Sequence, residues 1–285
     1  MSREHVTVVE VGPRDGLQNE AATVPGAEKV RFVELLAGAG LPVVEVTSFV
    51  SPRAVPQLAD ADEVLPAVHR REGVRYPVLV PNLRGLERAE AAGADAIAVF
   101  TAASEGFARA NVNMTIAESL AAFGPVLDRA LAAGMWTRGY VSTAFGCPYD
   151  GTVAPQAVAQ VARELAALGC DEISIGDTIG VARPKQVPEV VAAAAEHVPI
   201  ERMALHLHDT GGRALDNVAA GLETGVRIFD SSAAGLGGCP FAPGAPGNVA
   251  TEALVRFLER EGLETGVDPD AVEHAGRAVR GILAA

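Results

Sequence analysis

Short aliphatic runs alternate with Ala-rich amphipathic stretches along almost the whole chain, and this alternation restricts the fold more than any other feature of the sequence. Brief apolar runs bounded by turn residues are typical of buried strands, and longer stretches with helical periodicity are typical of helices. We expect strands near 6–11, 43–47, 76–80, 94–100, 137–141, 172–176, 203–208 and 228–231. We expect helices near 28–38, 60–70, 83–92, 116–133, 155–168, 188–197, 212–224, 249–261 and 269–283.

Glycine precedes four of the expected strands, in AGAGLPVVEV, AAGADAIAVF, AAGMWTRGYV and ALGCDEISIG. Glycine is favoured at the left-handed end of a helix, so these positions mark helix ends. Strands that alternate with helices form parallel sheets, and eight such units predict an α/β fold, a single (β/α)8 TIM barrel of about 250 residues. A doubly wound fold would carry a glycine-rich fingerprint where GPRDGLQNE follows the first strand. We expect one catalytic domain over 1–285, with a helical C-terminal extension at about 265–285.

The chain carries a formal net charge of −13, with 49% hydrophobic and 21% charged residues. This balance is typical of a globular rather than a disordered protein. The negative charge argues against nucleic-acid binding, which needs a basic face. No apolar run approaches the roughly 20 residues of a membrane span, and MSREHVTVVE does not resemble a signal or transit peptide. We therefore expect a cytoplasmic protein without nucleic-acid or membrane partners.

Polar and ionisable residues occupy the carboxyl ends of five expected strands, where TIM barrels carry their chemistry. Ionisable groups are seldom buried for packing alone, so this pattern predicts an active site. The residues are Arg14, Asp15 and Gln18 after the first strand, Glu45 in the second, Asp177 after the sixth, His206 and His208 in the seventh, and Cys239 and Asn248 after the eighth.

His206 and His208 are two residues apart in an expected strand, so both side chains point to one face while Leu205 points to the helices. Two inward imidazoles can be hydrogen-bonded core residues, but together with Asp15 at another strand end they favour a metal site. The amide oxygen of Asn248 is a further candidate ligand. A mixed nitrogen and oxygen ligand set without thiolates favours Mg²⁺ or Mn²⁺ over zinc.

Three charged residues near these strand ends each allow two interpretations. Arg14 is either half of an ion pair with Asp15 or a donor that stabilises an enolate or carboxylate through its rigid guanidinium fork. Glu45 follows an apolar run, so burial would require a partner, for which Arg14 and the metal are the candidates. Asp177 either caps the next helix or acts as a general acid or base.

Cysteine usage indicates a reducing compartment, because three cysteines are too few for a disulfide framework. Cys239 lies in the segment GLGGCPFAPGAPGN, whose glycines suit a loop that closes over a site. Cys147 follows the fifth expected strand and competes with Cys239 for a reactive role. Cys170 matches a buried apolar residue.

Six stretches together resemble the 3-hydroxy-3-methylglutaryl-CoA lyase family, metal-dependent TIM-barrel enzymes that break carbon–carbon bonds beside thioesters. The stretches are VGPRDGLQNE, VEVTSFVSPRAVPQ, GYVSTAFGCPYDG, EISIGDTIGV, HLHDT and DSSAAGLGGCPFAPGAPGNVATE, and they cover nearly all of the chain up to about residue 252. The most specific is GLGGCP with the downstream GNVATE. The RDG and H-x-H elements occur across a wider superfamily that includes Claisen-condensing synthases and biotin-dependent carboxyltransferases.

The resemblance implies roles for the residues at the strand ends. The implied ligands of Mg²⁺ or Mn²⁺ are Asp15, His206, His208 and Asn248. The implied catalytic residues are Arg14 for the acetyl-CoA enolate, Asp177 for proton transfer at the hydroxyl and Cys239 as an acid or base on the loop. The implied substrate-binding residues at the mouth of the site are Arg14, Gln18 and Glu45.

The resemblance further implies retro-Claisen cleavage of 3-hydroxy-3-methylglutaryl-CoA to acetyl-CoA and acetoacetate, as in leucine degradation and ketone-body formation, by a homodimer. The segment GGRA after HLHDT departs from the Tyr-Gly-Gln pattern of animal enzymes, and RGILAA lacks their cysteine-containing tail. The alternatives are a lyase for another C3 substituent, a condensing synthase, or an inactive metal-binding scaffold. A carboxyltransferase is disfavoured, because the only lysines, Lys29 and Lys185, lie away from the strand ends.

Overall fold

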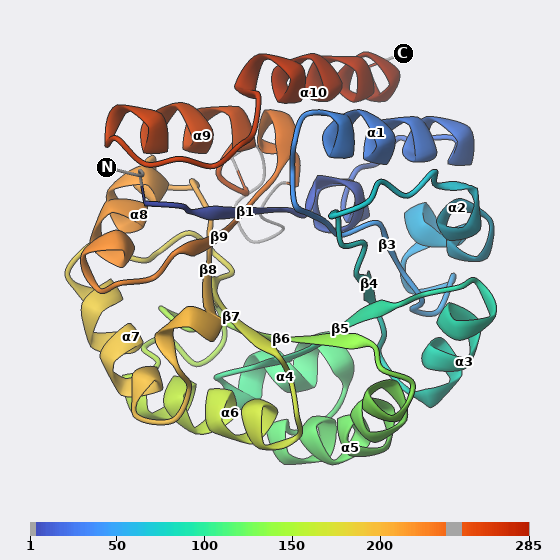
Figure 1. Ribbon diagram of the computed structural model, residues 1–285. Coiled ribbons are helices and arrows are strands. Elements are labelled where there is room, and N and C mark those ends of the chain that lie inside the picture. Colours follow the sequence, from blue (N-terminus) through green and yellow to red (C-terminus); the bar gives the residue numbers. More distant parts are fainter. Residues whose placement is uncertain (1–3, 238–246, 285) are drawn as a thin grey trace.

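The computed structural model describes residues 4–237 and 247–284, whose strands all belong to one parallel sheet (Figure 1). The strands are β1 (Thr7–Glu10), β2 (Val43–Val44), β3 (Thr47–Ser48), β4 (Val78–Leu79), β5 (Ala96–Ala102), β6 (Trp136–Ser142), β7 (Glu172–Asp177), β8 (Met203–Leu207) and β9 (Ile228–Ser231). Each of the eight predicted strands is present. The fold class, an α/β fold with a parallel sheet, is confirmed.

The sheet curls round on itself. Its strand order is β2-β1-β9-β8-β7-β6-β5-β4-β3, yet the two end strands are separated in the chain only by Glu45 and Val46. The N–H of Glu45 donates to the carbonyl of Glu10 (2.8 Å), whereas the N–H of Val46 donates to that of Pro77 (3.0 Å). The predicted strand at 43–47 is thus divided where it changes its pairing partner. The result is the TIM-barrel-like ring in Figure 1.

Helices surround this ring (Figure 1). They are α1 (Gly26–Gly38), α2 (Ala61–Ala67), α3 (Leu83–Ala91), α4 (Glu105–Val112), α5 (Ile116–Ala132), α6 (Pro155–Ala167), α7 (Gln186–Ala195), α8 (Ala214–Glu223), α9 (Thr251–Arg260) and α10 (Pro269–Leu283). Each predicted helix is present, and α10, at the C-terminal end of the chain, packs against α1 and α9. In the parts of the chain that the structure describes, no helix combines the length and apolar character that a bilayer span requires.

The predicted glycine helix ends are confirmed. Gly40, Gly93, Gly134 and Gly169 all have positive φ, between 72° and 97°, and each lies just before a strand. Gly40 is also sterically required, because a side chain there would strike the backbone of Gly266. These glycines reverse the chain between each helix and the strand that follows.

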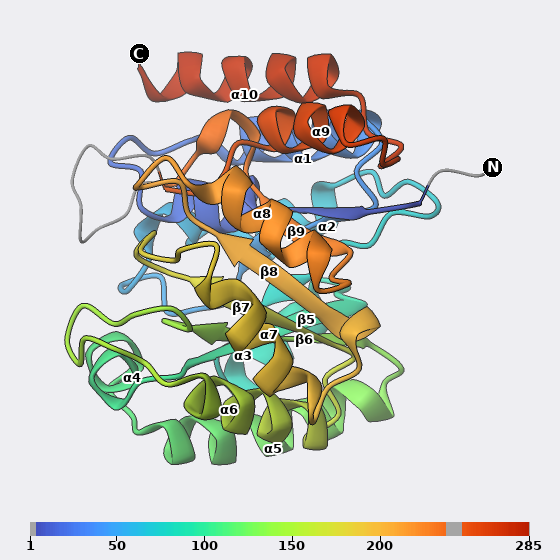
Figure 2. The same ribbon diagram turned by 90° about the vertical axis from the view of Figure 1, so that its left-hand side faces the viewer.

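Helix α4 is absent from the sequence prediction. It has eight residues, of which only Phe107 and Ala108 are buried, so its apolar periodicity is too short to be recognised. It ends at Asn113, whose φ of 55° lies in the left-handed region. Figure 2 shows α4 at the left, at the end of the barrel toward which β8 points, so the carboxyl ends of the strands lie near it.

Glu10 ties β1 to the segments that follow β9. Its side chain is fully buried, and one carboxylate oxygen accepts the N–H groups of Gly12 (2.7 Å) and Ala233 (3.0 Å). The other oxygen accepts the hydroxyl of Thr251 (2.7 Å). Burial raises the pKa of Glu10 to about 7 although these hydrogen bonds oppose the shift.

Glu10→Gln is expected to change how stability depends on pH. Because the pKa of Glu10 lies above its ordinary 4.5 in the folded chain, its contribution to stability is fully present below 4.5 and is lost as the pH rises through about 7. Glutamine keeps the acceptor for Gly12 and Ala233 but does not ionise. The free energy of unfolding of the variant, relative to wild type, should therefore rise by on the order of 3 kcal/mol between pH 4 and 8.

Urea unfolding at several pH values measures this difference. The matched control is Glu252→Gln, which removes a nearby carboxylate that accepts the N–H of Ala234. A flat difference for Glu10→Gln, or the same slope in the control, would contradict the assignment to Glu10.

Candidate active site

A cavity of about 520 Å³ lies at the carboxyl ends of the strands. Its lining includes the predicted residues Arg14, Asp15, Gln18, His206 and His208. Phe107 and Asn111 of α4 line it as well, so the helix that the sequence did not reveal forms part of its wall. Most of the residues expected at strand ends therefore share one cavity, as the barrel geometry requires.

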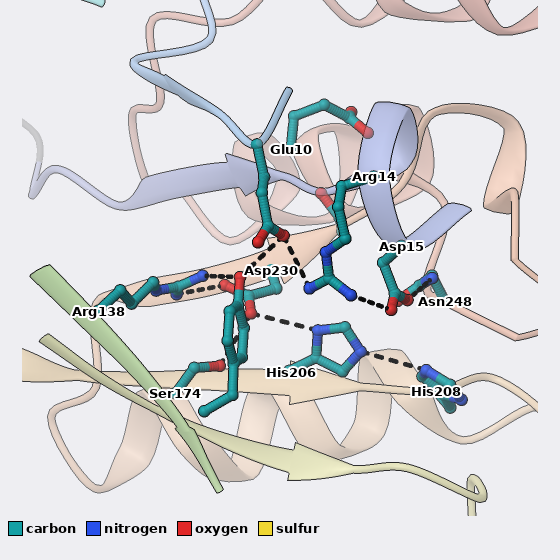
Figure 3. A network of polar contacts seen from close by, with 12 residues as sticks. Glu10, Arg14, Asp15, Arg138, Ser174, His206, His208, Asp230 and Asn248 are labelled. Carbon is teal, nitrogen blue, oxygen red and sulfur yellow. Dashed lines mark hydrogen bonds and ion pairs between the residues drawn. The ribbon is translucent and has the colours of Figure 1, made fainter. Parts of the chain in front are cut away.

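The two histidines face each other. His206 and His208 approach through their Nε2 atoms (3.1 Å), whereas Leu205 packs against Gly221 of α8. The predicted common face of the two imidazoles is confirmed. Asp15 completes the group, with one ligand atom from each of the three residues within 4.8 Å of the others. Figure 3 shows this approach of Asp15, from the π-helical turn after β1, toward the end of β8.

The donor atoms of this group suit a divalent cation. Asp230 accepts a hydrogen bond from Nδ1 of His206 (3.2 Å), which leaves Nε2 of that ring directed at the other two residues. Nδ1 of His208 is buried and has no hydrogen-bond partner among residues 4–237 and 247–284. Burial together with His206 lowers the pKa of His208 to about 3. His208 is therefore a neutral imidazole, the form that binds metals.

Asp15 is ionised. Burial alone would raise its pKa, but the charges of Arg14 and His206 outweigh burial, and the pKa lies well below its ordinary value. Asn248 supports this carboxylate, because its amide Nδ2 donates to Asp15 Oδ2 (2.9 Å) and to the carbonyl of Leu236 (3.1 Å). The amide nitrogen of Asn248, rather than its oxygen, thus faces Asp15, and ligation through the oxygen stays a prediction.

Arg14 is held from two sides. It lies in a π-helical turn (Gly12–Gly16), where its guanidinium pairs with Asp15 (2.6 Å) and with Glu45 (2.8 Å). Tyr140 also donates its hydroxyl to Glu45 (3.1 Å). Of the two candidate partners of a buried Glu45, Arg14 and the metal, the structure shows Arg14. Because Glu45 is fully buried beneath Arg14, its contacts position that guanidinium.

A second set of buried charged residues lies deeper in the barrel and was not predicted from the sequence. Arg138 of β6 has no exposed surface; it pairs with Asp230 of β9 (2.6 Å) and Glu172 of β7 (2.7 Å) and donates to the Tyr140 hydroxyl (2.8 Å). The available signal was a single charge inside each apolar run, WTRGYVS and IFDS. An isolated charge does not reveal its partner, which here lies 92 residues away.

Asp177 caps the turn that follows β7. Its two carboxylate oxygens accept the N–H groups of Val181 (2.9 Å) and Ala182 (3.0 Å), and its side chain is buried. Burial raises the pKa of Asp177 to about 6. Asp177 therefore caps this turn. The predicted cap of the next helix is not observed, because α7 begins at Gln186 with Lys185 at its N-cap position. A role in proton transfer stays a prediction.

The structure describes two of the three cysteines, Cys147 and Cys170. Cys239 lies outside the described residues. Cys147 is buried, and its sulfur accepts the N–H groups of Tyr149 (3.3 Å) and Asp150 (3.2 Å). Cys170 is buried in the main hydrophobic core, as expected. The contacts of Cys147 give it a structural place in a tight turn.

The fold and the site together define a barrel enzyme with a candidate metal centre at the carboxyl ends of its strands. The HMGL-like family model matches residues 5–279, and the chain belongs to this family. It is 51% identical over 273 residues to the hydroxymethylglutaryl-CoA lyase, mitochondrial, of Rattus norvegicus. The matched region covers 96% of this chain and 84% of the relative.

Solved structures agree with this relationship. The HMG-CoA lyase of Brucella melitensis matches with a TM-score of 0.97 and 52% identity, over 99% of this chain and 100% of that one. An HMG-CoA lyase of Acinetobacter baumannii, solved in complex with coenzyme A and 3-methylmalate, matches with a TM-score of 0.93 and 39% identity, over 98% and 92%.

Proposed function

We propose that the chain cleaves 3-hydroxy-3-methylglutaryl-CoA to acetyl-CoA and acetoacetate. The observation that supports this most is the placement of Arg14 beside Asp15 and the two histidines in one cavity. The near-complete coverage by relatives named as lyases of this substrate supports the same reaction. An acyl-CoA ligand is further supported by the relative that was solved with coenzyme A.

Asp15, His206 and His208 are the residues that would hold Mg²⁺ or Mn²⁺, with Asn248 as a fourth candidate ligand. When bound, such an ion acts as a Lewis acid that makes the tertiary hydroxyl of the substrate more acidic. The carboxylate and two imidazoles offer the mixed oxygen and nitrogen donors on which this assignment rests.

Arg14 stabilises the enolate in the proposed reaction. When the hydroxyl of the substrate loses its proton, the carbon–carbon bond breaks and its electron pair moves to the thioester, which becomes an enolate. A guanidinium already fixed by Glu45 and Asp15 needs no reorganisation as this charge develops. Gln18, on the wall of the same cavity, contacts the substrate.

Two protons move in this scheme. Asp177 accepts the hydroxyl proton, and Cys239 delivers a proton to the methylene carbon that becomes the acetyl methyl group. Val181 and Ala182 each donate one N–H to the carboxylate of Asp177, which keeps lone pairs free to accept the proton. A raised pKa suits a group that accepts a proton near neutral pH.

The domain organisation, cellular location and oligomeric state are also part of the proposal. If β2 and β3 are counted as one interrupted strand, the chain is a single (β/α)8 barrel over 1–285, to which α10 is an addition. We place it in the cytoplasm as a homodimer. Its relatives include lyases named as mitochondrial and as cytoplasmic.

Cleavage assays on a short series of 3-hydroxyglutaryl-CoA derivatives that differ at C3 test the proposal. Release of acetyl-CoA should be fastest from the 3-methyl substrate and should require added Mn²⁺ or Mg²⁺. Faster cleavage of another derivative would assign a different C3 substituent. Condensation without cleavage would indicate a synthase, and inactivity at saturating metal would leave a scaffold.

A further inference from the structure

The buried charged residues beneath the cavity form one connected network of ion pairs and hydrogen bonds. Arg138 stands at its centre and contacts Glu172 below and Asp230 and Tyr140 beside it. From there one branch leads through Asp230 to His206, and a second leads through Tyr140 and Glu45 to Arg14. Each branch therefore ends on a residue of the proposed reaction.

Among the residues that the structure describes, Asp230 has three polar partners, and all of them are hydrogen-bond donors. One carboxylate oxygen accepts the guanidinium of Arg138 (2.6 Å), and the other accepts the hydroxyl of Ser174 (2.8 Å) and Nδ1 of His206 (3.2 Å). The side chain is fully buried, so water does not compete for these positions. In Figure 3 Asp230 lies between Arg138 and the ring of His206.

An ionised carboxylate accepts hydrogen bonds and does not donate them. The paired guanidinium of Arg138 keeps Asp230 ionised, because it compensates the buried negative charge. Nδ1 of His206 must therefore carry a proton, whether the ring is neutral or charged. In the neutral ring the lone pair then lies on Nε2, the atom that faces His208 and Asp15.

We propose that Asp230, held by Arg138, is a positioning residue that fixes the tautomer and orientation of His206 and thereby prepares its Nε2 to bind a divalent cation. This inference rests on the proposed metal site. Outer carboxylates of this kind contribute about 10- to 100-fold to metal affinity in other proteins. Such partners fix the tautomer and orientation of the imidazole and raise its basicity.

Asp230→Asn tests the proposal sharply, because the orientation of the new amide is dictated by its neighbours. Arg138 offers only donors, so the amide oxygen must face it and the NH₂ group must face His206. The ring is then forced to accept at Nδ1 and to carry its proton on Nε2. We expect Mn²⁺ affinity, measured by calorimetry with the metal alone, to fall about 10- to 100-fold.

Nitrogen-15 NMR of the metal-free protein at alkaline pH gives a readout that is independent of activity. Wild type should show a proton on Nδ1 of His206, and Asp230→Asn should show it on Nε2. The matched control is Ser174→Ala, which removes another donor to the same carboxylate oxygen and should preserve both the wild-type tautomer and the Mn²⁺ affinity.

Three results would overturn the proposal. They are a proton on Nε2 of His206 in wild type, an unchanged tautomer in Asp230→Asn, and an equal loss of affinity in Ser174→Ala. The wild-type spectrum decides the question even if Asp230→Asn does not fold. If wild type binds no Mn²⁺, the metal site itself fails, and the spectra still report separately on Asp230.

Discussion

Chelation of divalent cations is expected to abolish the cleavage of 3-hydroxy-3-methylglutaryl-CoA, and addition of Mn²⁺ or Mg²⁺ is expected to restore it. Asp15, His206 and His208 line the same cavity, and their ligand atoms lie within 4.8 Å of one another. Both histidines are buried. A Lewis acid there is worth several kcal/mol of charge stabilisation, which corresponds to about 10³-fold in rate or more. Acetyl-CoA release before and after treatment measures the effect.

Asp15→Asn distinguishes the effect of an ion bound at this site from a general effect of added salt on activity. The substitution keeps the shape of the side chain and removes the charge that faces the imidazoles, so added Mn²⁺ should restore little activity and calorimetry should detect weakened Mn²⁺ binding. The control is Asp128→Asn on the exposed face of α5, which should behave as wild type. Full activity in thoroughly chelated protein, or in Asp15→Asn, would exclude the proposed centre.

Contacts that follow from strand periodicity could be predicted from the sequence. His206 and His208 share a face because alternate residues of a strand do so, and Leu205 correspondingly packs against α8. The need for a partner at Glu45 followed from the cost of burying a lone carboxylate, and Arg14 is the one of the two candidates that the structure shows. Each of these inferences used a local rule together with the order of strands in a barrel.

Contacts that depend on the exact register and depth of distant strands could not be predicted in this way. Arg138 and Asp230 meet across the barrel interior, and neither has a neighbour in sequence that reveals the other. Asp177 was ambiguous, because a carboxylate at the end of a strand can cap the next helix or serve catalysis, and the turn that it caps instead was not predicted. The orientation of the Asn248 amide likewise depends on the carbonyl of Leu236, a partner set by loop geometry.

Arg14→Lys is expected to slow cleavage by about 10²- to 10³-fold at saturating Mn²⁺, the range typical for loss of one preorganised donor to a developing oxyanion. The guanidinium of Arg14 contacts Asp15 through one nitrogen and Glu45 through another, so its plane is fixed before substrate arrives. A lysine ammonium is a single point charge on a flexible stem and does not reproduce this fork. The kcat for acetyl-CoA release is the quantity to compare.

The Mn²⁺ affinity of the same variants assigns the defect to Arg14 itself. Arg14→Lys keeps the positive charge beside Asp15, so metal affinity should change far less than kcat. Glu45→Gln is the matched control, because the amide oxygen still accepts from Arg14 while the ionic component of the contact is lost, and its effect on kcat should be intermediate. If both variants lost metal affinity and kcat in proportion, Arg14 would serve to support Asp15. A selective loss of kcat instead places the guanidinium at the charge that develops as the carbon–carbon bond breaks.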